Sequence, residues 1–172
     1  ILRLCILHRK KDRTMIDLNS YGWNDNLNRL KQESPHKNLP HGRVAIVHRT
    51  CYEVVSADGQ LQCELTGNMM YGKSDFELPC VGDWVIFQSF DEDKGIIVEM
   101  LPRERTLYRK KSGTVADTQS IASYVHKAAI SQSSHENFNP RRARSFMVQI
   151  FADGHSPILI RHKHALDFDR PQ

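Results

Sequence analysis

The pattern of hydrophobic and polar positions takes the period of β-strands at Gly42. Between Gly42 and Leu101, five short segments are rich in β-branched and aromatic residues and are separated by turn residues. The Asp58-Gly59 pair is a signal for a tight hairpin, and a longer loop follows the third segment. Five strands with one long connection predict a small closed barrel over residues 42–102, with an OB-fold as the first expectation and an SH3-like barrel as the alternative. The predicted strands are GRVAIVHRT, CYEVVS, LQCELTG, VGDWVIFQSF and GIIVEML.

A strand–helix–strand pattern follows in residues 121–172. SYVHKAAISQS and PILI are typical of buried strands. Between them, Asn139 is a suitable cap for a helix that begins with Pro140 and stops near Gly154. Such a unit places its strands parallel, with a right-handed crossover. One unit cannot cover both faces of a parallel sheet, so this α/β portion is predicted to be incomplete. The helix has one apolar face, formed by Ala143, Phe146, Met147, Ile150 and Phe151.

The segments that flank the barrel have weaker patterns. Residues 1–41 are predicted to be an N-terminal lead-in, with a short helix in NDNLNRLKQ and a linker rich in breakers after it. Met15 resembles a natural start, so residues 1–14 are expected to be translated upstream sequence or an accessory tail. Residues 103–120 are basic, polar and poor in apolar residues, which predicts a linker.

Composition is that of a soluble globular protein. Of the 172 residues, 40% are hydrophobic and 26% are charged, enough for one domain or two small ones. No apolar run approaches the roughly 20 residues that span a bilayer, so we expect a cytoplasmic protein with no membrane partner. The four cysteines form no C-x-x-C pair, which argues against a zinc ribbon. The opening segment is too short and too basic at its C-terminal end for a secretory signal, so reduced thiols are expected. His162 and His164 are close together, but two ligands do not make a metal site, and we expect a solvated loop.

The charge of the chain is unevenly distributed. Net charge is +4, yet the segment Glu53–Glu99 holds ten acidic and two basic residues, so it carries −8 and the rest carries +12. The positive charge gathers in residues 1–14, 101–111, 141–144 and 161–163. Such clusters are typical of a nucleic-acid partner but also of a solvated face, and charge alone leaves both interpretations open.

Four motifs, in order along the chain, resemble the N-terminal half of one family. They are GRVAIVHRTCYEVVSADGQLQCELTG, PCVGDWVIF, IIVEMLPRERTLYRK and FNPRRARSFM. The family is RsgA (also called YjeQ), a circularly permuted GTPase that acts in assembly of the small ribosomal subunit. The resemblance covers roughly residues 16–167. It implies an OB barrel, a GTPase domain and a C-terminal zinc-binding domain in the complete protein, with GTP, Mg²⁺ and structural Zn²⁺ as cofactors.

The resemblance places RHKHALD (161–167) at the guanine-recognition motif of the family, N-K-x-D. In that motif the Asp accepts two hydrogen bonds from guanine, the Asn helps to hold the base, and the Lys stem stacks along its ring. Here Lys163 matches, whereas His162 replaces the Asn and Ala165 replaces the Asp. Loss of a buried polar partner costs about 1–3 kcal/mol or more. His126 likewise stands where the family usually has an Asp. The guanine motif is therefore predicted to be degraded.

The phosphate-binding motif is a second departure from the family. No G-x-x-x-x-G-K-[ST] occurs in the 172 residues, so the sequence offers no P-loop to hold phosphates and Mg²⁺. The zinc ligands of the family's last domain are also missing from these residues. The chain thus resembles a truncated N-terminal portion. Alone, it is predicted to be inactive and to bind no GTP, Mg²⁺ or Zn²⁺.

Two functions remain open. In the first, the chain is the monomeric N-terminal portion of a ribosome-assembly GTPase, and its barrel and basic flanks bind small-subunit rRNA through phosphates. Bases would stack on Tyr52 or Tyr108, although barrel packing is the alternative for each ring, and Trp84 is expected to be structural. In the second, the chain is an interaction module for RNA or a ribosomal protein and never binds nucleotide. A third alternative, an unrelated barrel protein, would require all four motifs to match the family in order by chance. The residues expected to contact rRNA are Arg43, Arg49, Arg103, Arg105, Arg109, Lys110 and Lys111.

Overall fold

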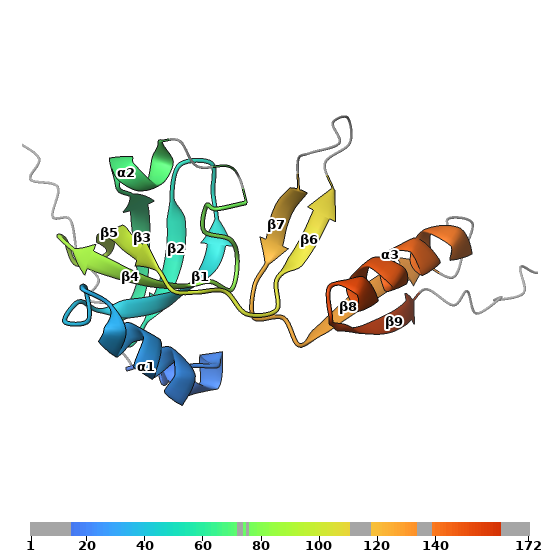
Figure 1. Ribbon diagram of the computed structural model, residues 1–172, viewed down its shortest axis with the longest axis horizontal. Coiled ribbons are helices and arrows are strands. Elements are labelled where there is room, and N and C mark those ends of the chain that lie inside the picture. The colour runs from blue at the N-terminus through green and yellow to red at the C-terminus, as the bar shows by residue number, and fades with distance from the viewer. Residues whose placement is uncertain (1–14, 72–73, 75, 111–117, 134–138, 163–172) are drawn as a thin grey trace, which may run out of the picture.

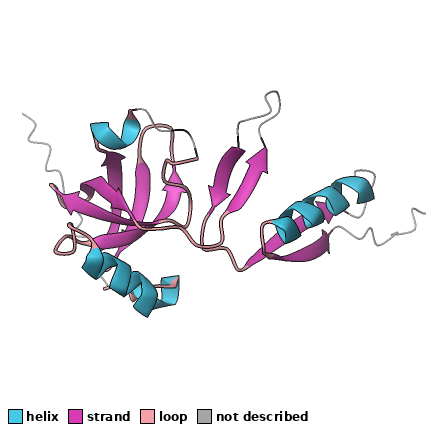
Figure 2. Ribbon diagram, viewed as in Figure 1, coloured by secondary structure: helices cyan, strands magenta, loops and turns pink. Residues whose placement is uncertain are grey.

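The computed structural model describes residues 15–71, 74, 76–110, 118–133 and 139–162 (Figure 1). Strands dominate the fold, and short helices lie at its periphery (Figure 2). The helices are the 3₁₀ helix η1 (Leu18–Tyr21), α1 (Asp25–Glu33), α2 (Gly67–Met70) and α3 (Pro140–Ala152). The strands are β1 (His41–Val47), β2 (Tyr52–Ser56), β3 (Gly59–Leu65), β4 (Trp84–Ser89), β5 (Lys94–Met100), β6 (Leu107–Lys110), β7 (Thr118–Ala122), β8 (Lys127–Ser133) and β9 (Ser156–His162).

The first five strands close into a barrel, which confirms the predicted architecture. Their order is β1-β2-β3-β5-β4, and β4 returns to pair with β1. The pairs are antiparallel except for β3 with β5, which run parallel. This five-stranded Greek-key closure is the OB-fold. Alternation places one face of each strand inside the barrel and the other outside it.

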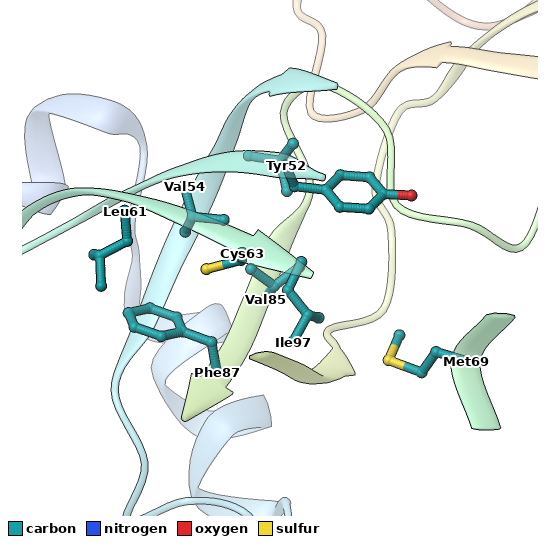
Figure 3. Close-up of a cluster of buried hydrophobic side chains, with 9 residues drawn as sticks. Tyr52, Val54, Leu61, Cys63, Met69, Val85, Phe87 and Ile97 are labelled. Carbon is teal, nitrogen blue, oxygen red and sulfur yellow. The ribbon is translucent and has the colours of Figure 1, made fainter. Parts of the chain in front are cut away.

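The inside of the barrel is filled by one apolar cluster (Figure 3). Met69 of α2 belongs to it, so α2 covers one opening of the barrel. Gly95 allows the strands to pack closely here, because a Cβ at this position would lie 3.2 Å from the sulfur of Cys63. Burial raises the pKa of the Cys63 thiol to about 12, so this cysteine is a packing residue. The other members are Val44, Tyr52, Val54, Leu61, Val85, Phe87 and Ile97.

A second apolar cluster lies outside the barrel, between β4 and the N-terminal lead-in. Leu18 and Leu27 pack against Trp84, Ile86 and Leu101. Strand β4 is therefore buried on both faces, which explains its continuous apolar run and confirms that Trp84 is structural. The predicted helix of the lead-in is α1. Its N-cap is the side chain of Asn24, which accepts a hydrogen bond from the N–H of Leu27.

A contact between α1 and β1 fixes the lead-in further. The Lys31 ammonium donates to His41 Nδ1 at 3.1 Å, and the His41 ring lies 3.9 Å from the ring of Trp23, measured between centroids. Burial and the adjacent Lys31 lower the pKa of His41 to about 4. His41 is therefore a neutral acceptor at pH 7, and the lead-in is part of the barrel's structural unit.

Within the predicted linker 103–120, the described residues 103–110 and 118–120 contain strand structure. Strands β6 and β7 pair antiparallel in a two-stranded sheet, and Val81 and Ala122 form a parallel bridge between this hairpin and the barrel. The pattern gave no strand signal because both strands are short and polar, with basic residues in β6 and Thr, Gln and Ser in β7. Pairing and tertiary contacts override their low apolar content.

Strands β8 and β9 pair parallel, with α3 between them in sequence, as predicted. The cap is Asn139, whose side chain accepts from the N–H of Arg142, and Pro140 is in the first turn. Only Ala143 and Ile150 of α3 are buried. Exposed apolar residues remain on α3 and on β9. They are Phe146, Val148 and Phe151 of α3 and Ile158, Leu159 and Ile160 of β9. None of the helices in the described residues is long and apolar enough to cross a membrane.

Candidate nucleic-acid interface

A buried ion pair joins the barrel to the β6–β7 hairpin. The Arg103 guanidinium donates from Nη2 to Asp83 Oδ2 at 2.7 Å and from Nε to Oδ1 at 3.0 Å. The Asp83 side chain is 0% exposed, and that of Arg103 is 12% exposed. The same guanidinium donates to the carbonyl oxygens of Phe76 and Leu78 and, at 3.3 Å, to Ser120 Oγ. All three nitrogens of the Arg103 guanidinium therefore donate hydrogen bonds within the fold.

Arg103 is therefore a structural residue, contrary to the expectation that it contacts RNA phosphates. Its donors already bond one carboxylate and two carbonyl groups. Breaking the hydrogen bonds to Asp83 would leave that carboxylate as a buried unpaired charge. Asp83 is the partner that the sequence analysis did not single out. The sequence carries no local signal for this pairing, because the two residues are 20 positions apart.

Arg43 is also tied into the fold. Its Nε donates to the carbonyl oxygen of Gly82 at 3.0 Å, and its Nη1 donates to that of Tyr21. The guanidinium carbon lies 5.8 Å from the centroid of the Trp84 ring. Arg43 thus fastens η1 and the turn before β4 to the outside of β1, and it is half-buried.

The remaining basic candidates are more open. Arg49 in the β1–β2 turn, Arg105 before β6 and Arg109 on β6 are exposed. Arg105 has a left-handed backbone, with φ 51°. Lys110 ends β6, but its side chain lies outside the described set, as does all of Lys111. Of the seven residues that were expected to contact rRNA, Arg49, Arg105 and Arg109 are therefore the described ones whose side chains are exposed to a polyanion.

The two tyrosines have different environments. Tyr52 is buried in the barrel interior, so packing is its role. Tyr108 is half-buried and stacks on Phe76 with ring centroids 5.5 Å apart and an interplanar angle of 20°. Phe76 is exposed, so the Phe76–Tyr108 pair presents an aromatic surface at β6.

The outer face of β2 and β3 is acidic. OB-folds commonly bind oligonucleotides on this face and through the β1–β2 and β4–β5 loops. Here the outward residues of β3 are Gln60, Gln62 and Glu64, and Glu53 of β2 accepts hydrogen bonds from His48 and Gln60. The β4–β5 turn adds Asp91, Glu92 and Asp93, all exposed. This face repels a phosphate backbone, so RNA contacts are favoured on the hairpin side.

The predicted guanine loop lies at the end of β9. His162 is the last residue of that strand and pairs in register with Ser133, at the carboxyl ends of both parallel strands. Open α/β sheets bind ligands at this edge. The side chain of His162 and all of Lys163, His164 and Ala165 lie outside the described residues. The described part of the chain contains no group of three or more His, Cys, Asp or Glu side chains placed to hold a metal ion.

Comparison with curated proteins gives clear relatives, although no family model matches the chain. Over 154 residues, which is 90% of the chain, it is 58% identical to "Small ribosomal subunit biogenesis GTPase RsgA 1" of Bacteroides thetaiotaomicron. The chain belongs to the RsgA family. A second relative, "Small ribosomal subunit biogenesis GTPase RsgA 1" of Oceanobacillus iheyensis, is 32% identical over 74% of the chain.

Solved structures of two proteins share the fold of this RsgA chain. They are YloQ, described as a circularly permuted GTPase, with TM-score 0.52, and YjeQ from Thermotoga maritima, with TM-score 0.51. The first is 22% identical and matches 80% of this chain; the second is 17% identical and matches 76%. The chain spans 43% of the Bacteroides relative and 45% of the YloQ structure. It therefore corresponds to the N-terminal portion of these longer proteins.

Proposed function

We propose that this chain is the small-subunit rRNA-binding portion of an RsgA-type ribosome biogenesis GTPase, which in its complete form couples GTP hydrolysis to subunit assembly. The observation that carries the proposal is the 58% identity, over 90% of the chain, to a protein named a small ribosomal subunit biogenesis GTPase. The exposed Arg49, Arg105 and Arg109, together with the Phe76–Tyr108 pair, support RNA binding, because phosphate contacts and base stacking together hold single-stranded RNA.

We further propose that these 172 residues alone bind neither GTP nor its Mg²⁺. The residues present do not fit that ligand: the sequence has no P-loop, and Ala165 cannot accept the two donors of guanine. The same observation favours a second candidate function, a nucleotide-free RNA- or ribosome-binding module. In both cases the protein acts in the cytoplasm, as a monomer, on the small subunit.

The test is binding of the 172-residue chain to purified small ribosomal subunits, with large subunits as the specificity control. A variant with Arg49, Arg105, Arg109, Lys110 and Lys111 changed to alanine is expected to flatten the slope of log K against log salt. The slope is expected to change by roughly 0.7–0.9 for each phosphate that the variant no longer neutralises. A matched control changes five basic residues elsewhere, Arg29, Lys37, Lys94, Arg141 and Arg144. Equal binding to both subunits, or equal slopes for both variants, would contradict the proposal.

A further inference from the structure

A groove of about 460 Å³ lies between the barrel and the segment that connects β7 to β8. Its barrel side is formed by β1 and by the end of η1, and its other side by residues 122–127. The volume falls in the range of sites that hold a small ligand. None of the described residues that line it is an aspartate or glutamate.

The floor of the groove is held by backbone hydrogen bonds. The N–H of Gly82 donates to the carbonyl oxygen of Val44 at 2.8 Å, and the N–H of Ser123 donates to that of Val81 at 2.9 Å. Gly82 has φ 94°, and a Cβ there would lie 2.3 Å from the carbonyl oxygen of Ser123. Only glycine permits this approach, so the two sides of the groove are in fixed contact.

The groove is lined by positive groups. Arg43 has no carboxylate within ion-pair distance among the described residues, since Asp83 is paired with Arg103. Burial lowers the pKa of the Arg43 guanidinium, and the nearby Tyr124 and Asp83 offset part of this effect. Lys127 and His126 line the same groove and are exposed. The charge of the site is therefore complementary to an anion.

The lining residue Tyr21 indicates which chemical class of anion the groove binds. Tyr21 lines the groove and is exposed, and its backbone carbonyl oxygen accepts a hydrogen bond from Arg43 Nη1, so the two residues lie on the same side of the groove. An exposed aromatic ring next to a cation is the arrangement that binds a base and its phosphate. The buried hydroxyl of Ser123 has no hydrogen-bond partner of its own; the nearby Cys80 thiol is a weak acceptor at most.

We propose that this groove binds one unpaired ribonucleotide, with its base against the ring of Tyr21. Its phosphate lies toward Lys127 and toward Nη2 of Arg43, the guanidinium nitrogen that is not used in the bonds to Gly82 and Tyr21. The inference rests on the proposed function and adds to it a single-stranded RNA subsite. A carboxylate-rich peptide would use the same cations but would leave the Tyr21 ring without a stacking partner, so a nucleotide is the better fit. Recognition of unpaired bases by stacking is the usual route to RNA selectivity.

The experiment measures fluorescence anisotropy of a labelled decauridylate with the 172-residue chain. Tyr21→Leu is expected to weaken binding roughly fivefold or more, whereas Tyr21→Phe keeps the ring and the affinity. Lys127→Gln is expected to reduce the salt slope by about 0.7, the value for one phosphate contact on a single strand, and Lys127→Arg restores it. Lys94→Gln, an exposed change on β5 outside the groove, is the control. With 4-thiouridine in the oligonucleotide, ultraviolet light is expected to yield a crosslink at Tyr21.

The outcomes separate the groove from the proposed function. If the alanine variant of the exposed basic residues loses RNA while Tyr21→Leu and Lys127→Gln bind like the parent chain, the groove inference is overturned and the proposed function stands. Competition by polyglutamate as effective as that by decauridylate, with no crosslink at Tyr21, overturns the nucleotide in favour of an acidic peptide. Failure of the parent chain to bind any RNA overturns both.

Discussion

Arg103 and Asp83 form an ion pair of 2.7 Å in which the carboxylate is completely buried. The two residues come from opposite sides of β4 and β5 in the sequence, and their pairing holds the loop after α2 and the β6–β7 hairpin against the barrel. An arginine that belongs to a basic cluster in the sequence therefore makes a buried structural contact in the fold.

Arg103→Ala is expected to lower the free energy of unfolding by about 3–5 kcal/mol, because it leaves a buried charge without a partner. Arg103→Lys rescues it only in part, since an ammonium cannot reproduce the bidentate contact. Urea unfolding monitored by tryptophan fluorescence measures both. Arg105→Ala, at an exposed neighbour, is the control and is expected to change stability little. A stable Arg103→Ala protein with weakened RNA binding would show that Arg103 is an RNA ligand after all.

Gly82→Ala is expected to destabilise the chain by more than the cost of a left-handed alanine. The added Cβ would lie 2.3 Å from the carbonyl oxygen of Ser123, whereas Gly59, with φ 124°, has no atom within 4 Å of its hypothetical Cβ. Both substitutions strain the backbone by roughly 1 kcal/mol or more, so Gly59→Ala isolates the clash. Thermal unfolding of the two variants provides the comparison, and equal melting temperatures would refute the close approach.

The stability of the barrel is expected to fall as pH drops from about 6.5 toward 4. The folded pKa of His41 is about 4, lowered first by burial and then by Lys31, against an ordinary value of 6.5. In this window the unfolded chain binds a proton at His41 that the folded chain excludes. Protonation therefore lowers the free energy of the unfolded state relative to the folded state. After allowance for solvent screening, the loss of stability is about 1–2 kcal/mol.

Urea unfolding at a series of pH values checks this dependence. His41→Gln is expected to remove much of the slope between pH 4 and 6.5, and Lys31→Met to reduce it by relieving the repulsion. A slope in that window that is the same in His41→Gln as in the parent chain would assign the titration to another group.

Guanine nucleotide is not expected to bind the 172-residue chain. The double change His162→Asn with Ala165→Asp restores only the base contacts, so it is expected to fail as well, because phosphate contacts have no loop to supply them. Titration with a fluorescent guanine nucleotide measures this, with an adenine nucleotide as the specificity control. Saturable, guanine-selective binding by the unmodified chain would mean that His162, Lys163 and His164 recognise the base.

The barrel and the βαβ unit were predictable because their apolar periods are local properties of the sequence. Alternation in β1, β2 and β3, the Asp58-Gly59 turn, and the Asn139 cap each carry their own signal. The β6–β7 hairpin was not predictable, since its strands are stabilised by pairing and by Arg103 rather than by apolar side chains.

The candidate site was harder to predict than the fold. The sequence pointed to seven basic residues of the barrel and its flanks, but burial divides them. Arg43 and Arg103 are bonded to backbone carbonyls, whereas Arg49, Arg105 and Arg109 are exposed. An arginine's partner depends on which carboxylate or carbonyl the tertiary structure brings near. The nearest clue for Arg103, an acidic residue 20 positions earlier, is visible only once the fold is known.

The burial of β4 on both faces has a consequence for synthesis of the chain. The apolar side of α1, with Leu27 at its centre, is made well before Trp84, the residue that covers it. At about 5–20 residues per second, translation of the intervening segment takes roughly 3–11 s. During that interval the apolar side of α1 lacks its partners on β4 and is open to chaperones, whereas Lys31 already has His41 and Ile16 already has the carbonyl oxygen of Ala57. The cluster around α1 is therefore completed late, when β4 and Leu101 have left the ribosome.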